Sequence, residues 1–265
     1  MDLKSKREYL KQIIVRKGSM IIAFSGGVDS SLLAVLAKET LCDKSRCILL
    51  DSPVVPREAI KEAQKIVKDF GLTLEIIPIS LMEDERFRTN PSERCYYCKK
   101  KSAGLLKQRM HELGFACVAD GMNVSDVDEY RPGLAASTEE GIEHPFIEAG
   151  ITKTDIRNIA RESGLYFWDK PSAACLSSRI PYGVEITSDN LRLIEEAEEF
   201  LHKKGFRQVR VRSHNNIARI EVMKKDIPQL LSIQDKVTTA LKKLGFVYVT
   251  LDLEGYRSGS MDKML

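Results

Sequence analysis

Over the first two-thirds of the chain, short apolar runs alternate with longer segments in which apolar residues recur every three to four positions. The short runs are typical of buried strands, and the longer segments are typical of amphipathic helices. After an N-terminal helix, the pattern predicts strands at 20–24, 46–51, 72–78 and 116–119, and helices at 30–41, 56–70 and 98–113. This alternation is typical of a parallel, doubly wound α/β sheet.

The pattern changes near Thr187, where a second group of elements begins. It predicts a helix at 190–204, a strand pair at 207–213 and 217–222, a helix at 227–244 and a final strand at 246–251. This order is typical of a small α+β unit. We therefore predict two domains: a parallel α/β domain over residues 1–185 and a smaller α+β domain over residues 186–265.

Two segments lack a clear period. Residues 120–145 are acidic and contain glycine, and we interpret them as loops over the edge of the sheet where such folds bind ligands. Residues 168–183 are interpreted as an ordered linker or an active-site loop. Four charged residues of the first segment are open to two interpretations, metal or ribose contact and a solvated acidic loop: Asp120, Asp126, Asp128 and Arg131.

The composition is that of a folded globular protein. Apolar residues make up 43% and charged residues 30% of the 265 residues, which excludes a mainly disordered chain. The net charge of +3, from 41 basic and 38 acidic residues, does not by itself indicate a nucleic-acid or membrane partner. Because the sequence has no apolar run of about 20 residues and no secretory signal, we expect a cytoplasmic protein.

The string AFSGGVDSS, residues 23–31, joins a predicted strand to a predicted helix. Glycine lets a backbone approach an anion closely, and a helix N-terminus favours negative charge. A Walker A loop would need a lysine that this string lacks. We predict a phosphate-binding loop rather than an ordinary turn, with Asp29 or Ser25 available to cap the helix. The candidate phosphate-binding residues are Ser25, Gly26, Gly27, Asp29, Ser30 and Ser31.

Three of the six cysteines carry a second chemical signal. Cys95 and Cys98 form a CxxC pair ahead of the predicted helix, and Cys175 lies in a loop between two prolines. Three lysines follow the pair at 99–101, and cations near a helix N-terminus favour the thiolate form. We do not expect structural disulfides in a reducing cytoplasm.

Four interpretations of these thiols are open. A zinc site would need a fourth ligand, and none of the four histidines has paired spacing. A thioredoxin-like CxxC would follow a strand, whereas this pair follows a polar, proline-containing run. The remaining two are unrelated free thiols and an iron–sulfur cluster that leaves one iron without a protein ligand. Beside a phosphate loop we favour the cluster, because an open iron can carry sulfide to an activated carbonyl.

The segment from Lys203 to Lys225 carries eight basic residues and a single acid, Glu221. Alternation along a strand places Arg210 and Arg212 on one face. That face is a solvated strand surface, an RNA-binding surface or a compact phosphate pocket in which two arginines hold one phosphate. The segment lacks the interleaved aromatic residues typical of RNA recognition, which argues against the second interpretation.

The phosphate-loop string resembles the PP-loop of the N-type ATP pyrophosphatases, a superfamily that includes NAD synthetase and tRNA-thiolating enzymes. The resemblance implies a PP-loop α/β domain that cleaves ATP between its α and β phosphates, holds the pyrophosphate and adenylates a substrate oxygen. It also implies that Mg²⁺ screens the phosphates, with Asp29 ordering the loop or the metal. Asp51 and Ser52 would lie beside the adenosine, and Gly121 would contact the nucleotide.

Further motifs resemble the LarE family, the ATP-dependent sulfur insertases of nickel-pincer nucleotide synthesis. They are ADGMNVSDVDEYRPG at 119–133, CLSSRIPYG at 175–183, RVRSHNNIARIE at 210–221 and LDLEGYRSG at 251–259. The resemblance implies that a carboxylate of pyridinium-3,5-biscarboxylic acid mononucleotide is adenylated and converted to a thiocarboxylate. It further implies that Ser178, Arg210 and Arg212 hold the substrate's phosphate, which favours the pocket interpretation.

The family resemblance implies two sulfur sources. One subgroup sacrifices the sulfur of a single cysteine that matches Cys175, and the other holds a [4Fe-4S] cluster with three cysteines. Because Cys95 and Cys98 are also present, we place this chain with the cluster subgroup and predict Cys175 as both catalytic residue and cluster ligand. The alternatives are sacrifice of Cys175, a tRNA-thiolating enzyme and a non-catalytic, nucleotide-binding iron–sulfur protein that acts as a sensor or carrier. We expect a small-molecule substrate, no nucleic-acid or membrane partner, and self-association.

Overall fold

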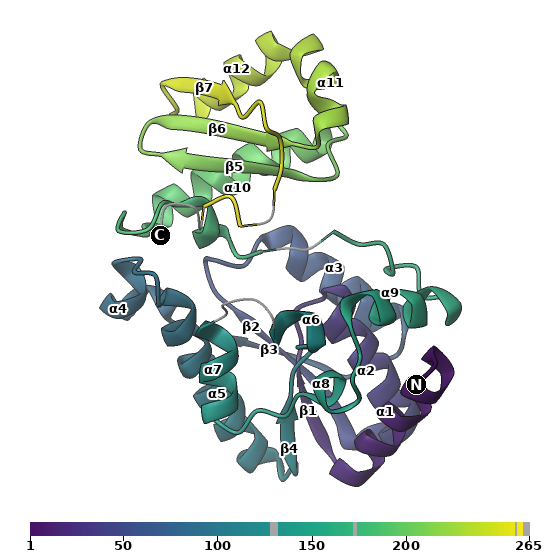
Figure 1. The fold of residues 1–265 in the computed structure, drawn as a ribbon. Coiled ribbons are helices and arrows are strands. Elements are labelled where there is room, and N and C mark those ends of the chain that lie inside the picture. The colour runs from purple at the N-terminus through teal and green to yellow at the C-terminus, as the bar shows by residue number, and fades with distance from the viewer. Residues whose placement is uncertain (128–131, 172–173, 258, 262–265) are drawn as a thin grey trace. The chain divides into compact units, whose positions relative to one another are not determined.

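The chain forms two compact units (Figure 1). The first comprises Met1–Leu81 and Glu93–Ala173, and the second comprises Met82–Ser92 and Ala174–Leu265. The computed structural model describes residues 1–127, 132–171, 174–257 and 259–261.

A four-stranded parallel sheet lies at the centre of the first unit, in the order β3-β2-β1-β4. Its strands are β1 (Met20–Ala23), β2 (Ser45–Asp51), β3 (Leu74–Pro78) and β4 (Cys117–Ala119). Met20 pairs with Ser45 on one side and with Cys117 on the other, so the carboxyl ends of β1, β2 and β4 share one edge. The predicted parallel α/β fold is confirmed.

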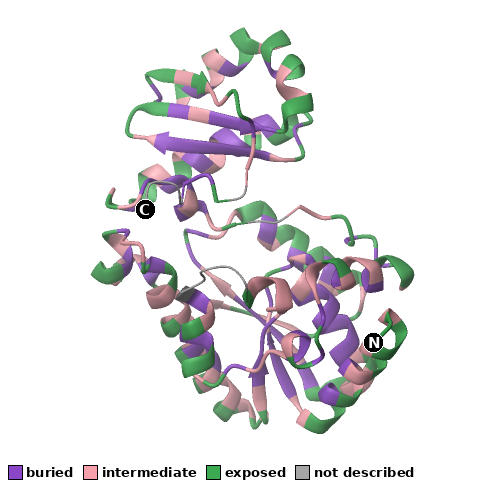
Figure 2. Ribbon diagram, viewed as in Figure 1, coloured by how far each residue is buried: buried purple, intermediate pink, exposed green. Residues whose placement is uncertain are grey.

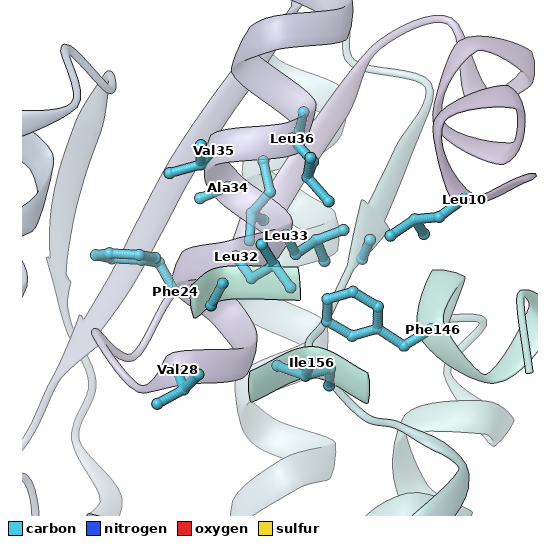
Figure 3. Packing of buried hydrophobic residues seen from close by; sticks show 14 of the residues in the cluster. Leu10, Phe24, Val28, Leu32, Leu33, Ala34, Val35, Leu36, Phe146 and Ile156 are labelled. Carbon is cyan, nitrogen blue, oxygen red and sulfur yellow. The ribbon is translucent and has the colours of Figure 1, made fainter. Parts of the chain in front are cut away.

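Helices cover both faces of this sheet. Successive strand residues point to opposite sides, so the apolar residues of a strand such as β1 need cover on both faces. Ile22 of β1 belongs to a core cluster with Leu33 and Phe146, part of which is drawn in Figure 3. Ile21 belongs to a second cluster, with Leu106. The long helices of the unit are α1 (Leu3–Lys17), α2 (Val28–Leu41), α3 (Arg57–Asp69), α5 (Arg94–Leu113) and α9 (Lys153–Glu162).

The prediction that residues 120–145 form only loops was wrong. They contain α6 (Val124–Val127) and α7 (Pro132–Glu139), and α8 (Pro145–Glu148) follows directly. Helices of one or two turns are too short to show the apolar period that reveals longer ones. Asp128 and Arg131 lie outside the described residues. The remaining short elements near the first unit are the 3-10 turns η1 (Cys42–Lys44) and η2 (Leu81–Glu83).

The second unit is built on a smaller sheet in the order β5-β6-β7. β5 (Val209–His214) pairs antiparallel with β6 (Ile217–Val222), and β6 pairs in parallel with β7 (Tyr248–Leu251). One face packs on helices through a core that includes Leu201, Val211, Ile220 and Leu241. The helices and turns of this unit are α4 (Glu85–Arg88), η3 (Leu176–Arg179), α10 (Ser188–Lys203), η4 (Lys224–Asp226), α11 (Ile227–Ser232) and α12 (Gln234–Leu244).

The helix predicted over 227–244 is in fact two helices. Ile233 interrupts it with a φ of −120° and a ψ of 20°. The apolar stripe continues across the interruption, with Leu230 and Val237 both buried in the same core, so the period of the sequence did not reveal it. A helix boundary that depends on backbone conformation alone cannot be predicted from the spacing of apolar residues.

The compact units divide the chain differently from the predicted boundary at residue 185. The segments 82–92 and 174–185 both belong to the second unit. Asn90, which is fully buried, shows why: its side-chain amide donates to the carbonyl oxygens of Pro181 at 2.7 Å and Val184 at 3.0 Å. These hydrogen bonds join residues about ninety positions apart, beyond the reach of a local pattern.

Buried residues are concentrated in β1 of the first sheet and in β5 and β6 of the second, whereas β3 and β7 contain none (Figure 2). Among the described residues, no helix combines the length and the apolar character that crossing a membrane requires.

Candidate functional site

The predicted phosphate loop follows β1 and ends in the first turn of α2. Ser25 Oγ lies 3.0 Å from Ser30 Oγ and accepts a hydrogen bond from the Gly27 N–H at 3.3 Å. The Ser25 N–H donates to Ser30 Oγ at 3.2 Å. Hydrogen bonds among its own residues therefore hold the loop in shape.

Gly26 occupies a position where a side chain is excluded. Its φ is 67°, and a Cβ built on it would lie 2.8 Å from the Cβ of Ala63 on α3. Both the backbone conformation and the close contact require glycine. The loop backbone therefore packs directly against a neighbouring helix.

The N-terminus of α2 is open at this loop. The helix begins at Val28 with Gly27 as its N-cap, and no described side chain caps it, so the prediction of a cap by Asp29 or Ser25 was wrong. The first N–H groups of a helix have no partner within the helix and can bind an anion. Ser31 is fully buried in this turn, and within the described part of the chain its Oγ has no hydrogen-bond partner.

Two lysines that the sequence did not single out contact the loop. Lys153, the first residue of α9, places its Nζ 2.5 and 2.6 Å from the two carboxylate oxygens of Asp29. Burial raises the pKa of Asp29, and the Lys153 ammonium opposes that rise. Lys170 Nζ donates to the Gly26 carbonyl oxygen at 2.8 Å. The loop carries no lysine of its own, but two distant segments bring cations to it.

Asp51 and Ser52 lie at the carboxyl end of β2, as predicted from the strand pattern. Arg57 forms an ion pair with Asp51 Oδ1 at 2.6 Å and donates to the Ser52 carbonyl oxygen at 2.6 Å. Ser52 is buried, and its Oγ has no hydrogen-bond partner among the residues that the structure describes. Arg57 thus fixes the backbone turn that presents this hydroxyl.

Gly121 follows β4 and packs against the first turn of α2. A Cβ on Gly121 would lie 2.8 Å from the backbone nitrogen of Ser30 and 2.9 Å from the carbonyl carbon of Asp29. The ends of β4 and β1 therefore meet at the phosphate loop with no room for a side chain. The nucleotide contact of Gly121 stays a prediction.

Asp120, the preceding residue, is buried rather than part of a solvated acidic loop. Its Oδ1 lies 2.8 Å from His144 Nδ1, and its Oδ2 lies 3.7 Å from Lys99 Nζ. Burial alone would raise the pKa of Asp120, but the hydrogen bond to His144 and the charge of Lys99 hold that pKa below its ordinary value. Asp120 is therefore ionised and ties α5 to the end of β4.

Cys95 and Cys98 lie in the first two turns of α5, so the prediction that the pair precedes the helix was wrong. Residues three apart on a helix are neighbours on its surface, and the two thiols therefore share a face. Cys95 is exposed and Cys98 is half-buried. The early start of the helix was missed because its first turn carries polar and aromatic residues rather than an apolar stripe.

Cys175 belongs to the second unit and immediately precedes η3. Its Sγ lies 3.0 Å from Ser177 Oγ, and its carbonyl oxygen accepts a hydrogen bond from Ser178 Oγ at 2.8 Å. Within the described residues, no group of three or more His, Cys, Asp or Glu side chains is placed to hold a metal ion. The joint site of the three thiols stays a prediction.

The three predicted phosphate-binding residues come together in the second unit. Arg212 NH1 donates to the Ser178 carbonyl oxygen at 3.0 Å, and Arg212 NH2 donates to Glu221 Oε2 at 2.7 Å. Arg210 and Arg212 are only 6% and 5% exposed, which excludes the solvated-face interpretation. In the described part of the chain, the Arg212 Nε–H has no hydrogen-bond partner.

A buried ion pair that the sequence did not reveal lies beside these residues. Arg179 donates from Nε and NH2 to both carboxylate oxygens of Glu198, each at 2.9 Å, and from NH1 to the Cys175 carbonyl oxygen at 3.0 Å. Burial would raise the pKa of Glu198, but the Arg179 charge lowers it overall. Glu198 Oε1 also accepts the Val211 N–H at 2.9 Å, so this pair links the Cys175 turn to the strand of Arg210 and Arg212.

The chain is similar to known proteins over nearly all of its length. The NAD synthase family matches residues 3–111, the part that holds the phosphate loop and the CxxC pair. The pyridinium-3,5-bisthiocarboxylic acid mononucleotide synthase of Lactiplantibacillus plantarum is 37% identical over 264 residues, covering 99% of this chain and 96% of that protein. The chain belongs to the LarE family.

Other relatives match over a similar length. An uncharacterised protein of Synechocystis is 40% identical over 266 residues, which is 99% of both chains. An uncharacterised protein of Methanocaldococcus jannaschii is 34% identical over 259 residues, covering 94% of this chain and 99% of that protein. The LarE resemblance of the sequence motifs is thereby confirmed over the whole chain.

Proposed function

We propose that this LarE-family enzyme converts the carboxylates of pyridinium-3,5-biscarboxylic acid mononucleotide to thiocarboxylates at the expense of ATP. The observation that carries the proposal is the full-length similarity to the L. plantarum synthase, whose name states the bisthiocarboxylic product. Two features support it: an open phosphate loop in the first unit, and a buried arginine pocket joined to a cysteine turn in the second.

The first half-reaction takes place at the phosphate loop. The glycine backbone and the open N-terminus of α2 bind the β and γ phosphates, and Lys153 and Lys170 bring positive charge to them. A substrate carboxylate oxygen attacks the α-phosphorus, the bond to the β-phosphate oxygen breaks, and pyrophosphate leaves. Asp51 and Ser52 lie beside the adenosine, Gly121 contacts the nucleotide, and bound Mg²⁺ screens the phosphate charge.

The substrate's own phosphate binds in the second unit. Ser178, Arg210 and Arg212 form its pocket, in which the Arg212 Nε–H is a buried donor without a hydrogen-bond partner among the described residues. Arginine presents a planar fork of N–H groups that suits a phosphate. Because Arg179 joins this pocket to the Cys175 turn, binding the phosphate positions the acyl group relative to Cys175.

In this proposal, Cys95, Cys98 and Cys175 would be the ligands of a [4Fe-4S] cluster. Three thiolates are a suitable donor set for such a cluster, and the exposed Cys95 and half-buried Cys98 share one helix face. Such a cluster, with one iron not ligated by the protein, would supply the sulfide that replaces AMP at the acyl carbon. Cytoplasmic location and self-association stay predictions.

A second candidate is sacrifice of the Cys175 sulfur itself. One observation favours it: Cys175 shares the second unit with the phosphate pocket, whereas Cys95 and Cys98 belong to the first. Multiple turnover separates the two candidates. Under anaerobic conditions with added iron and sulfide, we expect Cys95→Ala and Cys175→Ala to abolish multiple turnover, and Cys42→Ala, which removes an exposed cysteine, to retain it.

The adenylation step is tested by ATP–pyrophosphate exchange. We expect exchange only when the pyridinium dicarboxylate mononucleotide is present, in the wild type and in all three cysteine variants. Exchange without that substrate would contradict the proposed acceptor. Multiple turnover by Cys95→Ala would remove the cluster mechanism. A wild type limited to one sulfur transferred per chain, with Cys175 losing its sulfur, would instead establish sacrifice of Cys175.

A further inference from the structure

We propose that the C-terminal segment, residues 252–257 and 259–261, is part of the substrate-phosphate pocket, where Ser260 positions Arg212 and Tyr256 positions Arg210. The inference rests on the proposed function, because it concerns the pocket that holds the substrate's phosphate. It assigns a role to the motif LDLEGYRSG at 251–259. The phosphate loop, the three thiols and the strand of Arg210 and Arg212 give that motif no role.

The C-terminal segment is fixed along β6. The Asp252 N–H donates to the Ile220 carbonyl oxygen at 2.9 Å, and the Tyr256 N–H donates to the Val222 carbonyl oxygen at 2.8 Å. Gly255 has a φ of 70°, and a Cβ there would lie 2.9 Å from the Val222 carbonyl oxygen. The close approach of backbone to backbone brings the residues that follow to the face of the sheet that carries the arginines.

Ser260 joins two charged side chains of that face. Its Oγ donates to Glu221 Oε1 at 2.9 Å and accepts from Arg212 NH2 at 3.0 Å. Ser260 is 9% exposed and Glu221 is fully buried, so these hydrogen bonds form away from water. One hydroxyl therefore satisfies an oxygen of Glu221 and fixes the rotation of the Arg212 guanidinium.

The orientation of Arg212 decides which donors face the ligand. NH2 is engaged by Glu221 and Ser260, and NH1 donates to the Ser178 carbonyl oxygen. The Nε–H remains without a hydrogen-bond partner among the described residues, although it is buried. An unpaired buried donor is costly, and a phosphate oxygen satisfies it. Without the Ser260 hydroxyl, the guanidinium loses one of the contacts that hold this donor in place.

Tyr256 supports the second arginine in a different way. The Arg210 guanidinium carbon lies 5.4 Å from the centroid of the Tyr256 ring. A cation over an aromatic face is attracted by the ring, and arginine is well suited to this contact. The C-terminal segment thus contacts both arginines, and the pocket it completes takes a phosphomonoester.

The test compares a mononucleotide with its nucleoside. Nicotinic acid mononucleotide and nicotinic acid riboside are titrated into the full-length protein, and they differ only in the phosphate. We expect Ser260→Ala to weaken mononucleotide binding about tenfold and to leave riboside binding unchanged, since one hydrogen bond to a charged group is lost. Ser260→Thr keeps the hydroxyl and should restore binding, and Ser232→Ala, which removes an exposed serine of the same unit, should have no effect.

Tyr256 gives an independent arm of the test. We expect Tyr256→Phe to bind the mononucleotide like the wild type, because the ring is retained, and Tyr256→Leu to bind it about threefold more weakly. Unchanged riboside binding shows that each variant is folded. If Ser260 or Tyr256 only stabilised the fold, its substitution would weaken the binding of both the mononucleotide and the riboside.

Two negative results are distinguishable. If the wild type prefers the mononucleotide and Ser260→Ala prefers it equally, the C-terminal segment is not part of the pocket, and the proposed function is unaffected. If the wild type itself does not distinguish the two ligands, the phosphate pocket is wrong and this inference fails with it.

Discussion

The phosphate sites proposed in the two units differ in their chemistry. The loop of the first unit relies on backbone: a glycine with positive φ at Gly26, a close approach at Gly121 and an open N-terminus of α2. The pocket of the second unit relies on buried guanidinium groups whose charges are partly balanced by Glu198 and Glu221. A backbone site is sensitive to added volume, whereas a buried charged site is sensitive to lost charge. Substitutions should therefore break the two sites in different ways.

The largest effect should follow from removing one charge of the buried ion pair in the second unit. Glu198→Ala leaves the Arg179 guanidinium, which is 2% exposed, without its carboxylate. Removing one partner of a buried pair costs about 3–5 kcal/mol, which urea unfolding measures. The matched change Glu199→Ala, on the same helix but in an exposed pair with Lys203, should cost less than about 1 kcal/mol. Equal and small losses would show that the buried pair is not structural.

The first unit should instead respond to a single added methyl group. Gly121→Ala places a Cβ 2.8 Å from the Ser30 nitrogen, and such overpacking costs about 1–3 kcal/mol. We expect weaker ATP binding, measured by calorimetry, because the first turn of α2 shifts. Gly104→Ala on α5 meets no atom within 4 Å and should be neutral or stabilising. ATP binding by Gly121→Ala at wild-type strength would contradict the close packing of this loop.

Arg212→Lys tests whether the second unit needs a guanidinium fork rather than a charge alone. A lysine keeps the charge but loses the planar donors, so the KM for the pyridinium mononucleotide should rise about tenfold. The KM for ATP should not change, because the proposed ATP site lies in the other unit. Arg207→Lys, an exposed change just before β5, should leave both constants unchanged. A rise in the ATP constant would place Arg212 in the nucleotide site instead.

The smallest effect concerns pH, and its sign should differ between the units. The pKa of Asp29 is raised by burial, so its contribution to stability is present below its unfolded pKa, near 3.8, and is lost as pH rises through the folded value. The pKa of Glu198 is lowered overall, so its contribution is present above its unfolded pKa, near 4.5, and is lost as pH falls through the folded value.

The comparison is made with Asp29→Asn and Glu198→Gln. As the pH falls from neutral to about 3, the free energy of unfolding of the wild type should rise relative to Asp29→Asn. Over the same range it should fall relative to Glu198→Gln. Parallel curves for the wild type and either variant would show that the carboxyl group in question titrates alike in the folded and unfolded chain.

The parts of the molecule that could be predicted from the sequence are those encoded locally. The parallel sheet follows from apolar runs such as that of β1, because each strand is buried by its own residues. The phosphate loop follows from one contiguous string, since its serines and glycines contact one another within a single turn. Arg210 and Arg212 follow from strand alternation, because their shared face is a local property.

The parts that could not be predicted depend on partners from distant segments. Lys153 reaches Asp29 across 124 positions, and Lys170 reaches Gly26 across 144. Glu198 lies four residues after Ile194 and three before Leu201, so the helical period places it on the buried face of α10. The period does not reveal the partner that makes its burial possible, Arg179, which comes from another segment.

The most direct test of the account is the product of a complete reaction. The full-length protein is reconstituted with iron and sulfide in the absence of oxygen and is then given ATP and pyridinium-3,5-biscarboxylic acid mononucleotide. The products are separated and identified by mass spectrometry. We expect each carboxylate oxygen replaced by sulfur to be matched by one AMP and one pyrophosphate. AMP released without any thiocarboxylate, or no AMP at all with this substrate, would contradict a sulfur insertase.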